Sequence, residues 1–146
     1  MIKSFSEEFS FLSNFFQCPV RWGGIEFATA EHAYQASKTL DVHERMSIAL
    51  LDTPGKAKRA GRKLTIRHDW EEIKVDLMAH IVGVKFETNP ALMSKLVATG
   101  YHVLVEGNKW HDNFWGACLC FTCRGITGEN HLGKILMQIR DDHTGQ

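Results

Sequence analysis

Apolar and polar residues alternate on both sides of a pair of glycines near the N-terminus. Residues 20–22 and 25–27 each place apolar side chains at their two ends, and Gly23-Gly24 lies between them. Such alternation is typical of half-buried strands, and paired glycines suit a tight turn in which both central residues have positive φ. The pattern therefore predicts a short β-hairpin over residues 20–27.

Helix-start signals follow the hairpin at two places. Thr29 is placed to cap a helix that runs from Ala30 to about Leu40. Thr53 followed by Pro54 marks the start of another helix, because proline suits the first helical position. The helical spacing of this second segment predicts a narrow stripe suited to close packing, formed by Ala57, Ala60, Gly61 and Leu64.

A longer helix is expected from Asp69 to about Phe86. Asp69-x-x-Glu72 has the form of a capping box, with Asp in place of Ser or Thr. Apolar residues recur with helical spacing after it, and the predicted inner face holds Ile73, Leu77, Ile81 and Val84.

The C-terminal third predicts three more elements. Asn89-Pro90 starts a short helix that Gly100 ends, and residues 102–106 have the pattern of a short strand. Asn130 is expected to cap a last helix whose inward residues are Leu132, Ile135, Leu136 and Ile139. About five helices and roughly two to four strands predict a helix-rich α+β fold, because strands are too few for a doubly wound sheet.

Length and composition narrow the class of protein. A chain of 146 residues suits one domain, expected over residues 1–146, and its 44% apolar and 23% charged residues are near the globular average. Lysine plus arginine equals aspartate plus glutamate at 17 each, which excludes a uniformly basic nucleic-acid coat but leaves room for a local basic patch. No apolar run is long enough for a membrane span, so no membrane partner is expected. Four cysteines without a secretion signal predict free thiols and a cytoplasmic location.

An unusual polar face is predicted on the helix that starts at Ala30. Glu31, Tyr34, Gln35 and Lys38 share one side of it, where a core helix would place leucine or valine. A carboxylate, a phenol, an amide and an amine would then meet in one place. The alternative is that Glu31 is an ordinary acid of the first turn and Lys38 a solvated base of the last turn.

The segment between Thr53 and His68 contains six basic residues and no acid. Arg59, Arg62 and Lys63 fall on one helical face, and guanidinium groups bind phosphate oxygens in pairs. This pattern predicts a phosphate or pyrophosphate site, with a solvated basic face as the alternative. Neither a P-loop nor a G-x-G-x-x-G motif is present, so nucleoside triphosphate chemistry has no support.

A loop rich in aromatic and polar residues follows over residues 106–116. Asp112 beside Trp115 can present a carboxylate and a stacking ring to a sugar or a base, unless the aromatic residues are only a structural plug. His111 with Cys118-x-Cys120-x-x-Cys123 supplies enough soft ligands for zinc, although free or buried thiols explain the same residues.

Several segments together resemble the NADAR family, also called the YbiA-like family. The resemblance extends over nearly the whole chain and is carried, in the family's order, by Phe11-x-Ser13-Asn14-Phe15, Ala30-Glu31-His32-x-Tyr34-Gln35-Ala36-x-Lys38, Ala60-Gly61-Arg62, Lys85-Phe86, Leu104-Val105-Glu106, Asp112-x-x-Trp115-Gly116 and Gly128-x-Asn130-x-Leu132-Gly133-x-x-Leu136-Met137-x-x-Arg140. It implies a YbiA-like fold without a metal or bound cofactor, and it disfavours zinc because the cysteines fall where the family varies.

The resemblance also implies an activity. Members of the family are N-glycosidases that cleave the bond between a ribose C1 and an exocyclic amine. Their substrates are phosphoribosylamino-pyrimidine intermediates of riboflavin synthesis, or ADP-ribose attached to the amino group of guanine, including guanine in nucleic acid. The expected partner is therefore a small ribosyl-phosphate or ADP-ribosyl molecule, with ADP-ribosylated nucleic acid as a further target. The alternatives are a non-catalytic module that binds ADP-ribose or NAD, and a zinc-stabilised adaptor.

Roles for individual residues follow from the chemistry of that bond, since positive charge develops at C1 and the leaving amine needs a proton. Glu31 is expected near the sugar hydroxyls and Asp112 at the transferred proton. Lys38, and after it Lys85, is the candidate for a Schiff base with C1. The other expected substrate-binding residues are Asn14, Arg59 and Arg62 for phosphate, Trp115 for stacking, Asn130 for a phosphate or hydroxyl, and His32, Gln35 and Gly116 beside them.

Overall fold

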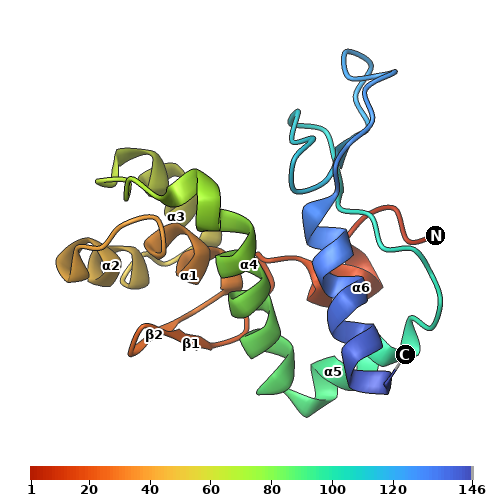
Figure 1. The fold of residues 1–146 in the computed structure, drawn as a ribbon, viewed down its shortest axis with the longest axis horizontal. Helices are drawn as coiled ribbons and strands as arrows, with labels where there is room; N and C mark the ends of the chain where they lie inside the picture. The colour runs from red at the N-terminus through yellow and green to blue at the C-terminus, as the bar shows by residue number, and fades with distance from the viewer. Residues whose placement is uncertain (146) are drawn as a thin grey trace. The chain divides into compact units, whose positions relative to one another are not determined.

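The computed structural model describes residues 1–145 (Figure 1). The described chain forms two compact units: a central unit of residues 14–88 and a terminal unit in which residues 1–13 join residues 89–145. Most regular structure in both units is helical and the strands are short, which confirms the prediction of a helix-rich α+β fold.

The central unit begins with the predicted hairpin. Strands β1 (Val20–Trp22) and β2 (Ile25–Phe27) are antiparallel, and Val20 pairs with Phe27. Gly23 and Gly24 have φ of 59° and 78°, the positive values that the tight turn requires.

Four α-helices complete the central unit: α1 (Ala30–Ala36), α2 (Val42–Ala49), α3 (Pro54–Ala60) and α4 (Trp70–Glu87), with the short 3-10 helix η2 (Gly61–Lys63) after α3. Helix α1 packs against α2, α3 and α4 and against the hairpin (Figure 1). Every residue of α1 is buried as a result, its polar side chains included.

Hydrogen bonds confirm two of the predicted helix starts. The Thr29 side chain accepts from the N–H of His32, and the Thr53 side chain accepts from the N–H of Lys56. Helix α1 ends at Ala36, however, earlier than the predicted end near Leu40, because Asp41 caps a separate helix that the analysis did not predict. Asp41 accepts from the N–H groups of its second and third neighbours, and this D-x-x-E pattern was the missed signal.

Helix α4 matches its predicted range, but two details differ. Asp69 makes no side-chain cap, because its carboxylate accepts instead from Arg67 at 2.8 Å. The buried face also differs from the predicted one, since Ile73 and Leu77 are only half-buried and the buried residues include Met78, Val82, Lys85 and Phe86. Because Lys85 is on the buried face, the apolar periodicity of the sequence does not identify that face correctly.

The terminal unit contains η1 (Glu7–Leu12), α5 (Pro90–Ala98), the parallel pair β3 (Gly107–Asn108) and β4 (Ala117–Cys118), and α6 (His131–Thr144). The predicted helices from Pro90 and after Asn130 are present. The predicted strand over residues 102–106 is not, because Leu104 makes only a single bridge to Ile2.

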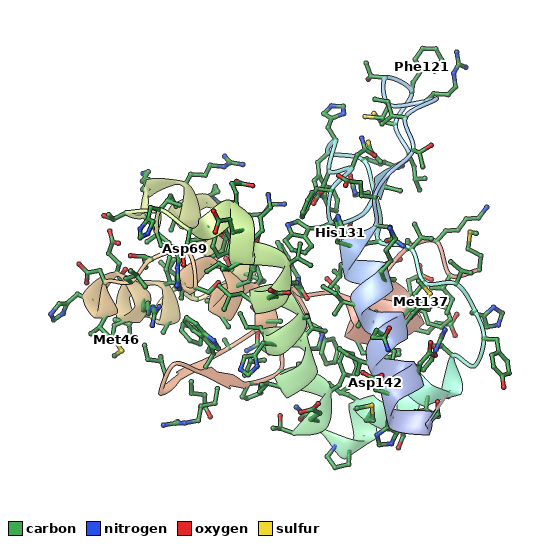
Figure 2. The ribbon with its side chains drawn as sticks, in the orientation of Figure 1. Met46, Asp69, Phe121, His131, Met137 and Asp142 are labelled. Carbon is green, nitrogen blue, oxygen red and sulfur yellow. The ribbon has the colours of Figure 1, made fainter. Side chains whose placement is uncertain are left out.

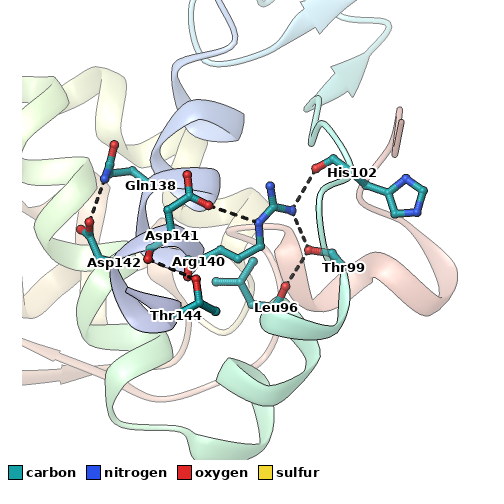
Figure 3. A network of polar contacts seen from close by, with 8 residues as sticks. All are labelled: Leu96, Thr99, His102, Gln138, Arg140, Asp141, Asp142 and Thr144. Carbon is teal, nitrogen blue, oxygen red and sulfur yellow. Dashed lines mark hydrogen bonds and ion pairs between the residues drawn. The ribbon is translucent and has the colours of Figure 1, made fainter. Parts of the chain in front are cut away.

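A buried arginine joins α6 to the end of α5. Arg140 donates from one terminal nitrogen to Thr99 Oγ1 and to the His102 carbonyl, each at 2.9 Å (Figure 3). Thr99 Oγ1 in turn donates to the Leu96 carbonyl at 2.6 Å. These bonds satisfy backbone oxygens where α5 ends and fix the register of α6 against it.

Among the described residues, no helix has both the length and the apolar character that crossing a bilayer requires.

Candidate active site

Helix α1 presents a buried pair of polar side chains in the central unit. Glu31 and Gln35 are 7% and 3% exposed, and Gln35 Nε2 donates to Glu31 Oε1 at 2.8 Å. The N–H of Glu31 donates to the Asn14 carbonyl at 3.0 Å, which ties the chain entering the central unit to the first turn of α1. A buried carboxylate held by an amide in this way is unusual on a packing helix and is typical of a functional position.

Close approach of η2 makes this pair tight. A Cβ at Gly61 would overlap the end of the Gln35 side chain, so any larger residue there would have to displace the buried amide. The predicted stripe of small residues on α3 therefore serves to bring the backbone against the polar face of α1.

Lys38 lies just after α1, against two aromatic rings. Its Nζ is 5.7 Å from the centroid of the Tyr34 ring and 6.0 Å from that of Trp70, and these two rings are 5.3 Å apart. Burial lowers the pKa of Lys38, Glu31 opposes that shift, and the nearby cations Arg62, Lys58 and Lys74 lower the pKa further.

Lys85 is more deeply buried than Lys38, at 1% exposed. Its Nζ is 5.6 Å from the centroid of the Phe16 ring and 5.2 Å from that of Phe86. Burial lowers the pKa of Lys85 to about 8, and the neighbouring Cys18 opposes the shift. The central unit thus holds two lysines whose amines lose their protons more readily than an exposed lysine does.

Asn14 and His32 flank the pair in different ways. Asn14 Nδ2 donates to Met78 Sδ at 3.3 Å, and its side-chain oxygen is buried without a hydrogen-bond partner among the described residues. Both ring nitrogens of His32 are engaged, with Thr29 Oγ1 at 2.7 Å and the Leu51 carbonyl at 2.9 Å. Asn14 therefore has a buried acceptor that the described residues leave unsatisfied, whereas His32 holds α1 to the segment after α2.

The predicted phosphate-binding arginines, Arg59 and Arg62, are exposed on α3 and η2. Arg62 is near enough to Lys38 to affect its pKa, so part of the basic segment faces the same region as the buried pair. The structure thus groups Glu31, Gln35, Lys38 and Arg62 in one part of the central unit.

The loop with Asp112 belongs to the terminal unit. Asp112 Oδ1 accepts from the N–H groups of Phe114 at 3.0 Å and Trp115 at 2.8 Å. Asn108 braces the same loop, because its oxygen accepts from the N–H groups of Trp110 and Asp112 and its amide donates to the Asp112 carbonyl. One oxygen of Asp112, the residue that the sequence analysis assigned to proton transfer, therefore orders its own loop.

The same loop caps helix α6 with its carbonyl groups. The N–H groups of His131 and Leu132 donate to the carbonyls of Phe114 and Trp115 at 3.1 and 3.0 Å. Asn130 contributes no side-chain cap, because its amide bridges the Glu106 N–H and the Leu104 carbonyl. The sequence analysis expected Asn130 to bind a phosphate or hydroxyl at this helix start, but the N–H groups that would bind a phosphate there already donate to carbonyl groups.

Two other predicted residues of this loop are built into its packing. A Cβ at Gly116 would overlap the backbone and side chain of Glu106, so glycine is required there by close approach. The rings of Phe114 and Trp115 meet edge to face at 4.8 Å, and Phe114 also packs on the ring of His131. His131 lies at the start of α6 (Figure 2).

Beyond the predicted set, the structure adds aromatic neighbours of the two lysines. Trp70 lies beside Lys38, and Phe16 lies beside Lys85. Both pairs are distant in sequence, so no spacing rule could have joined them. The sequence spacing did group His111, Cys118, Cys120 and Cys123 as possible zinc ligands, although free thiols and the family resemblance were favoured over zinc, and their ligand atoms do gather in the terminal unit.

Comparisons with known proteins agree on one family. Residues 2–143 match the NADAR domain, and the match includes residues of both units. The N-glycosidase YbiA of Escherichia coli K12 is 34% identical over 140 residues, which are 94% of this chain and 84% of that protein. The NMR structure of the E. coli protein YbiA superposes with a TM-score of 0.82 at 33% identity, over 98% of this chain and 83% of that one.

A longer relative is also similar. A riboflavin biosynthesis protein of Vibrio vulnificus is 36% identical over 138 residues. The match covers 93% of this chain but only 36% of the length of that protein. The extent of the domain match and the identity to relatives of similar length lead to one conclusion. The chain belongs to the NADAR family.

Proposed function

We propose that the chain is an N-glycosidase that hydrolyses the bond between a ribose C1 and an exocyclic amine. Its relatives of similar length are named N-glycosidases, in E. coli and in Shigella boydii. The observation that carries the proposal is the buried Glu31–Gln35 pair, which lies in a unit that also holds two lysines with lowered pKa values.

The carboxylate has a direct use in this reaction. Breaking a ribosyl C–N bond develops positive charge at C1, and a nearby carboxylate lowers the energy of that state. Gln35 donates to one oxygen of Glu31 and holds the carboxylate in a fixed position for this role. Water then adds to C1, and the departing amine takes a proton from a general acid.

A lysine offers a second route to the same products. A ribosylamine in its ring-opened form is an imine at C1, and a neutral lysine amine attacks that carbon. The exocyclic amine leaves with a proton, and a lysine Schiff base remains until water hydrolyses it to the free sugar. Burial favours the neutral amine at both Lys38 and Lys85, as this step requires.

Two substrate classes fit the charges of the central unit. Both phosphoribosylamino-pyrimidines and ADP-ribosylated guanine carry phosphate, and the exposed guanidinium groups of Arg59 and Arg62 are the proposed partners, with Arg62 close enough to Lys38 to affect its pKa. Asn14 adds a buried acceptor for a hydroxyl or amine of the substrate. ADP-ribosylated guanine in nucleic acid is a further proposed target.

The test is hydrolysis by the purified chain of both substrate classes in parallel, with products identified by mass spectrometry. Release of free ADP-ribose or of ribose 5-phosphate supports the proposal and selects the class. Tight ADP-ribose binding with no turnover of either substrate would instead identify a non-catalytic binding module.

Glu31→Gln tests the carboxylate. The substituted amide keeps the size of the side chain and an oxygen for Gln35, so the protein should keep its unfolding midpoint. Loss of the charge should lower kcat/KM by about 10²–10⁴-fold. Glu26→Gln, an exposed carboxylate on β2, is the matched control and should leave kcat/KM unchanged.

Trapping with borohydride separates the two routes. Reduction during turnover fixes a Schiff base as a stable secondary amine, and peptide mapping shows whether Lys38 or Lys85 carries the sugar. Activity without any trapped adduct would favour the route through water and Glu31.

A further inference from the structure

The terminal unit gathers four soft ligands that the proposed hydrolysis does not use. His111, Cys118, Cys120 and Cys123 each contribute one ligand atom, and these atoms all lie within 4.8 Å of one another. His111 Nδ1 lies 3.2 Å from Cys123 Sγ, 3.4 Å from Cys120 Sγ and 3.9 Å from Cys118 Sγ. None of the four cysteines of the chain forms a disulfide.

These separations match the edges of a tetrahedron around zinc. Zn–S and Zn–N bonds of about 2.3 and 2.0–2.1 Å imply N···S edges of about 3.6 Å, near the middle of the three observed distances. Three thiolates and one imidazole are also a donor set that selects zinc over harder cations. From this geometry we infer that the chain binds one structural Zn²⁺ through His111, Cys118, Cys120 and Cys123.

The backbone around the ligands is fixed in ways that serve such a site. His111 has φ of 69°, a left-handed conformation that is costly for a non-glycine residue and aims its ring at the sulfurs. Asn108 accepts from the N–H groups on both sides of His111, at Trp110 and Asp112. The strained residue is therefore braced by the loop that holds it.

The sulfur side of the site is braced as well. Asn113 Oδ1 accepts from the N–H of Cys118 at 2.9 Å, and Cys118 Sγ accepts from the N–H of Cys120 at 3.5 Å. Hydrogen bonds from backbone N–H groups to a ligating sulfur stabilise its thiolate form and orient it toward the metal. Phe121, between the last two cysteines, lies at the tip of the loop (Figure 2).

The site closes a loop and leaves no position for catalysis. Four protein ligands complete a tetrahedron, so no water can be activated on the ion, and the inference does not depend on the proposed hydrolysis. Binding converts three thiols into thiolates and releases their protons to solvent. The ion would hold together the loop of residues 111–123, which contains Asp112.

The first measurement is the metal content of the chain, produced without a polyhistidine tag and purified in a reducing buffer. About one zinc per chain is expected, and Co²⁺ exchanged into the site should give the visible bands of a tetrahedral ion with sulfur-to-cobalt charge transfer. Cys123→Ser should lower the zinc content to below about 0.1 per chain.

Matched variants keep the result independent of folding. His111→Asn removes the ligand but tolerates positive φ, and it should lose zinc, whereas His111→Cys restores a four-ligand set and should retain it. Cys18→Ala removes the cysteine outside the group and should keep about one zinc per chain.

Chelation supplies a readout that does not require activity. Removal of the ion should lower the thermal unfolding midpoint of the natural chain and leave that of His111→Asn unchanged. The inference is overturned if the folded, reduced chain, incubated with Zn²⁺, holds far less than one ion and shows no cobalt charge transfer.

Discussion

Lys85 shows how a single residue can couple stability to pH. Its side chain is 1% exposed, and burial lowers its pKa from 10.5 to about 8. Between these two values the folded chain holds Lys85 neutral while the unfolded chain binds a proton there. Stability then rises with pH across this window, because the unfolded state binds more protons than the folded state.

We therefore expect Lys85 to add roughly 2–4 kcal/mol to the free energy of unfolding as the pH rises from about 8 to about 10.5. Urea unfolding of the natural chain and of Lys85→Met across this range measures the effect as a difference in slope. Equal slopes in the two proteins would show that the folded state keeps Lys85 protonated.

The candidate site could be predicted at the level of single residues only where side chains share one helix. Glu31 and Gln35 were joined correctly by their spacing of four. The sequence analysis assigned Asn130 to binding a phosphate or hydroxyl. Its side-chain amide instead hydrogen-bonds the backbone of residues 104 and 106, about 25 residues away in sequence. Such a contact depends on tertiary folding and leaves no local pattern.

At the scale of elements, α1 depends on how closely its neighbours approach. The hairpin and three helices cover α1, and Gly61 lets η2 reach the Gln35 amide. A side chain at that point would push Gln35 away and leave Glu31 buried without its donor, which costs more than a lost surface contact.

Gly61→Ala should therefore lower the free energy of unfolding by about 1–3 kcal/mol and reduce activity through Glu31. Gly55→Ala on the preceding helix α3 is the matched control, since a Cβ there meets only ordinary contacts at 3.7 and 4.0 Å. That change should be neutral or slightly stabilising. Equal effects of the two substitutions in denaturant unfolding and kinetics would refute the argument from close approach.

The predicted elements succeeded where local chemistry decides them. Paired glycines specified the hairpin, and threonine caps specified the starts of α1 and α3. The strand expected over residues 102–106 failed because a strand needs a partner, and Ile2 offers Leu104 only one bridge. Helix α2 was overlooked, although Asp41 carries a local signal for its start.

For the whole molecule, charge balance conceals an uneven distribution. Seventeen basic and seventeen acidic residues cancel, yet no acid occurs between Thr53 and His68. In the proposed function, attraction of a phosphate-bearing substrate would depend on this one basic segment and would be screened by salt over about 10 Å at 0.1 M.

Replacing Arg59 and Arg62 together by glutamine should raise KM by about 10-fold at low salt and change kcat little. The rise of KM with salt seen for the natural chain should become shallower in this variant. Lys134→Gln, an exposed charge on α6, should keep the natural salt dependence. Steady-state kinetics at several salt concentrations would decide against a phosphate role if all three proteins respond alike.

The carbonyl groups that cap α6 make the Asp112 loop and the helix a single mechanical piece. Residues 113–116 accept from the N–H groups of Glu129, Asn130, His131 and Leu132, so the loop cannot open without uncapping the helix. The rate at which these four amides exchange hydrogen for deuterium therefore measures how often the loop opens. The exchange rates of these four amides thus report the opening rate of the loop, and they can be measured without substrate.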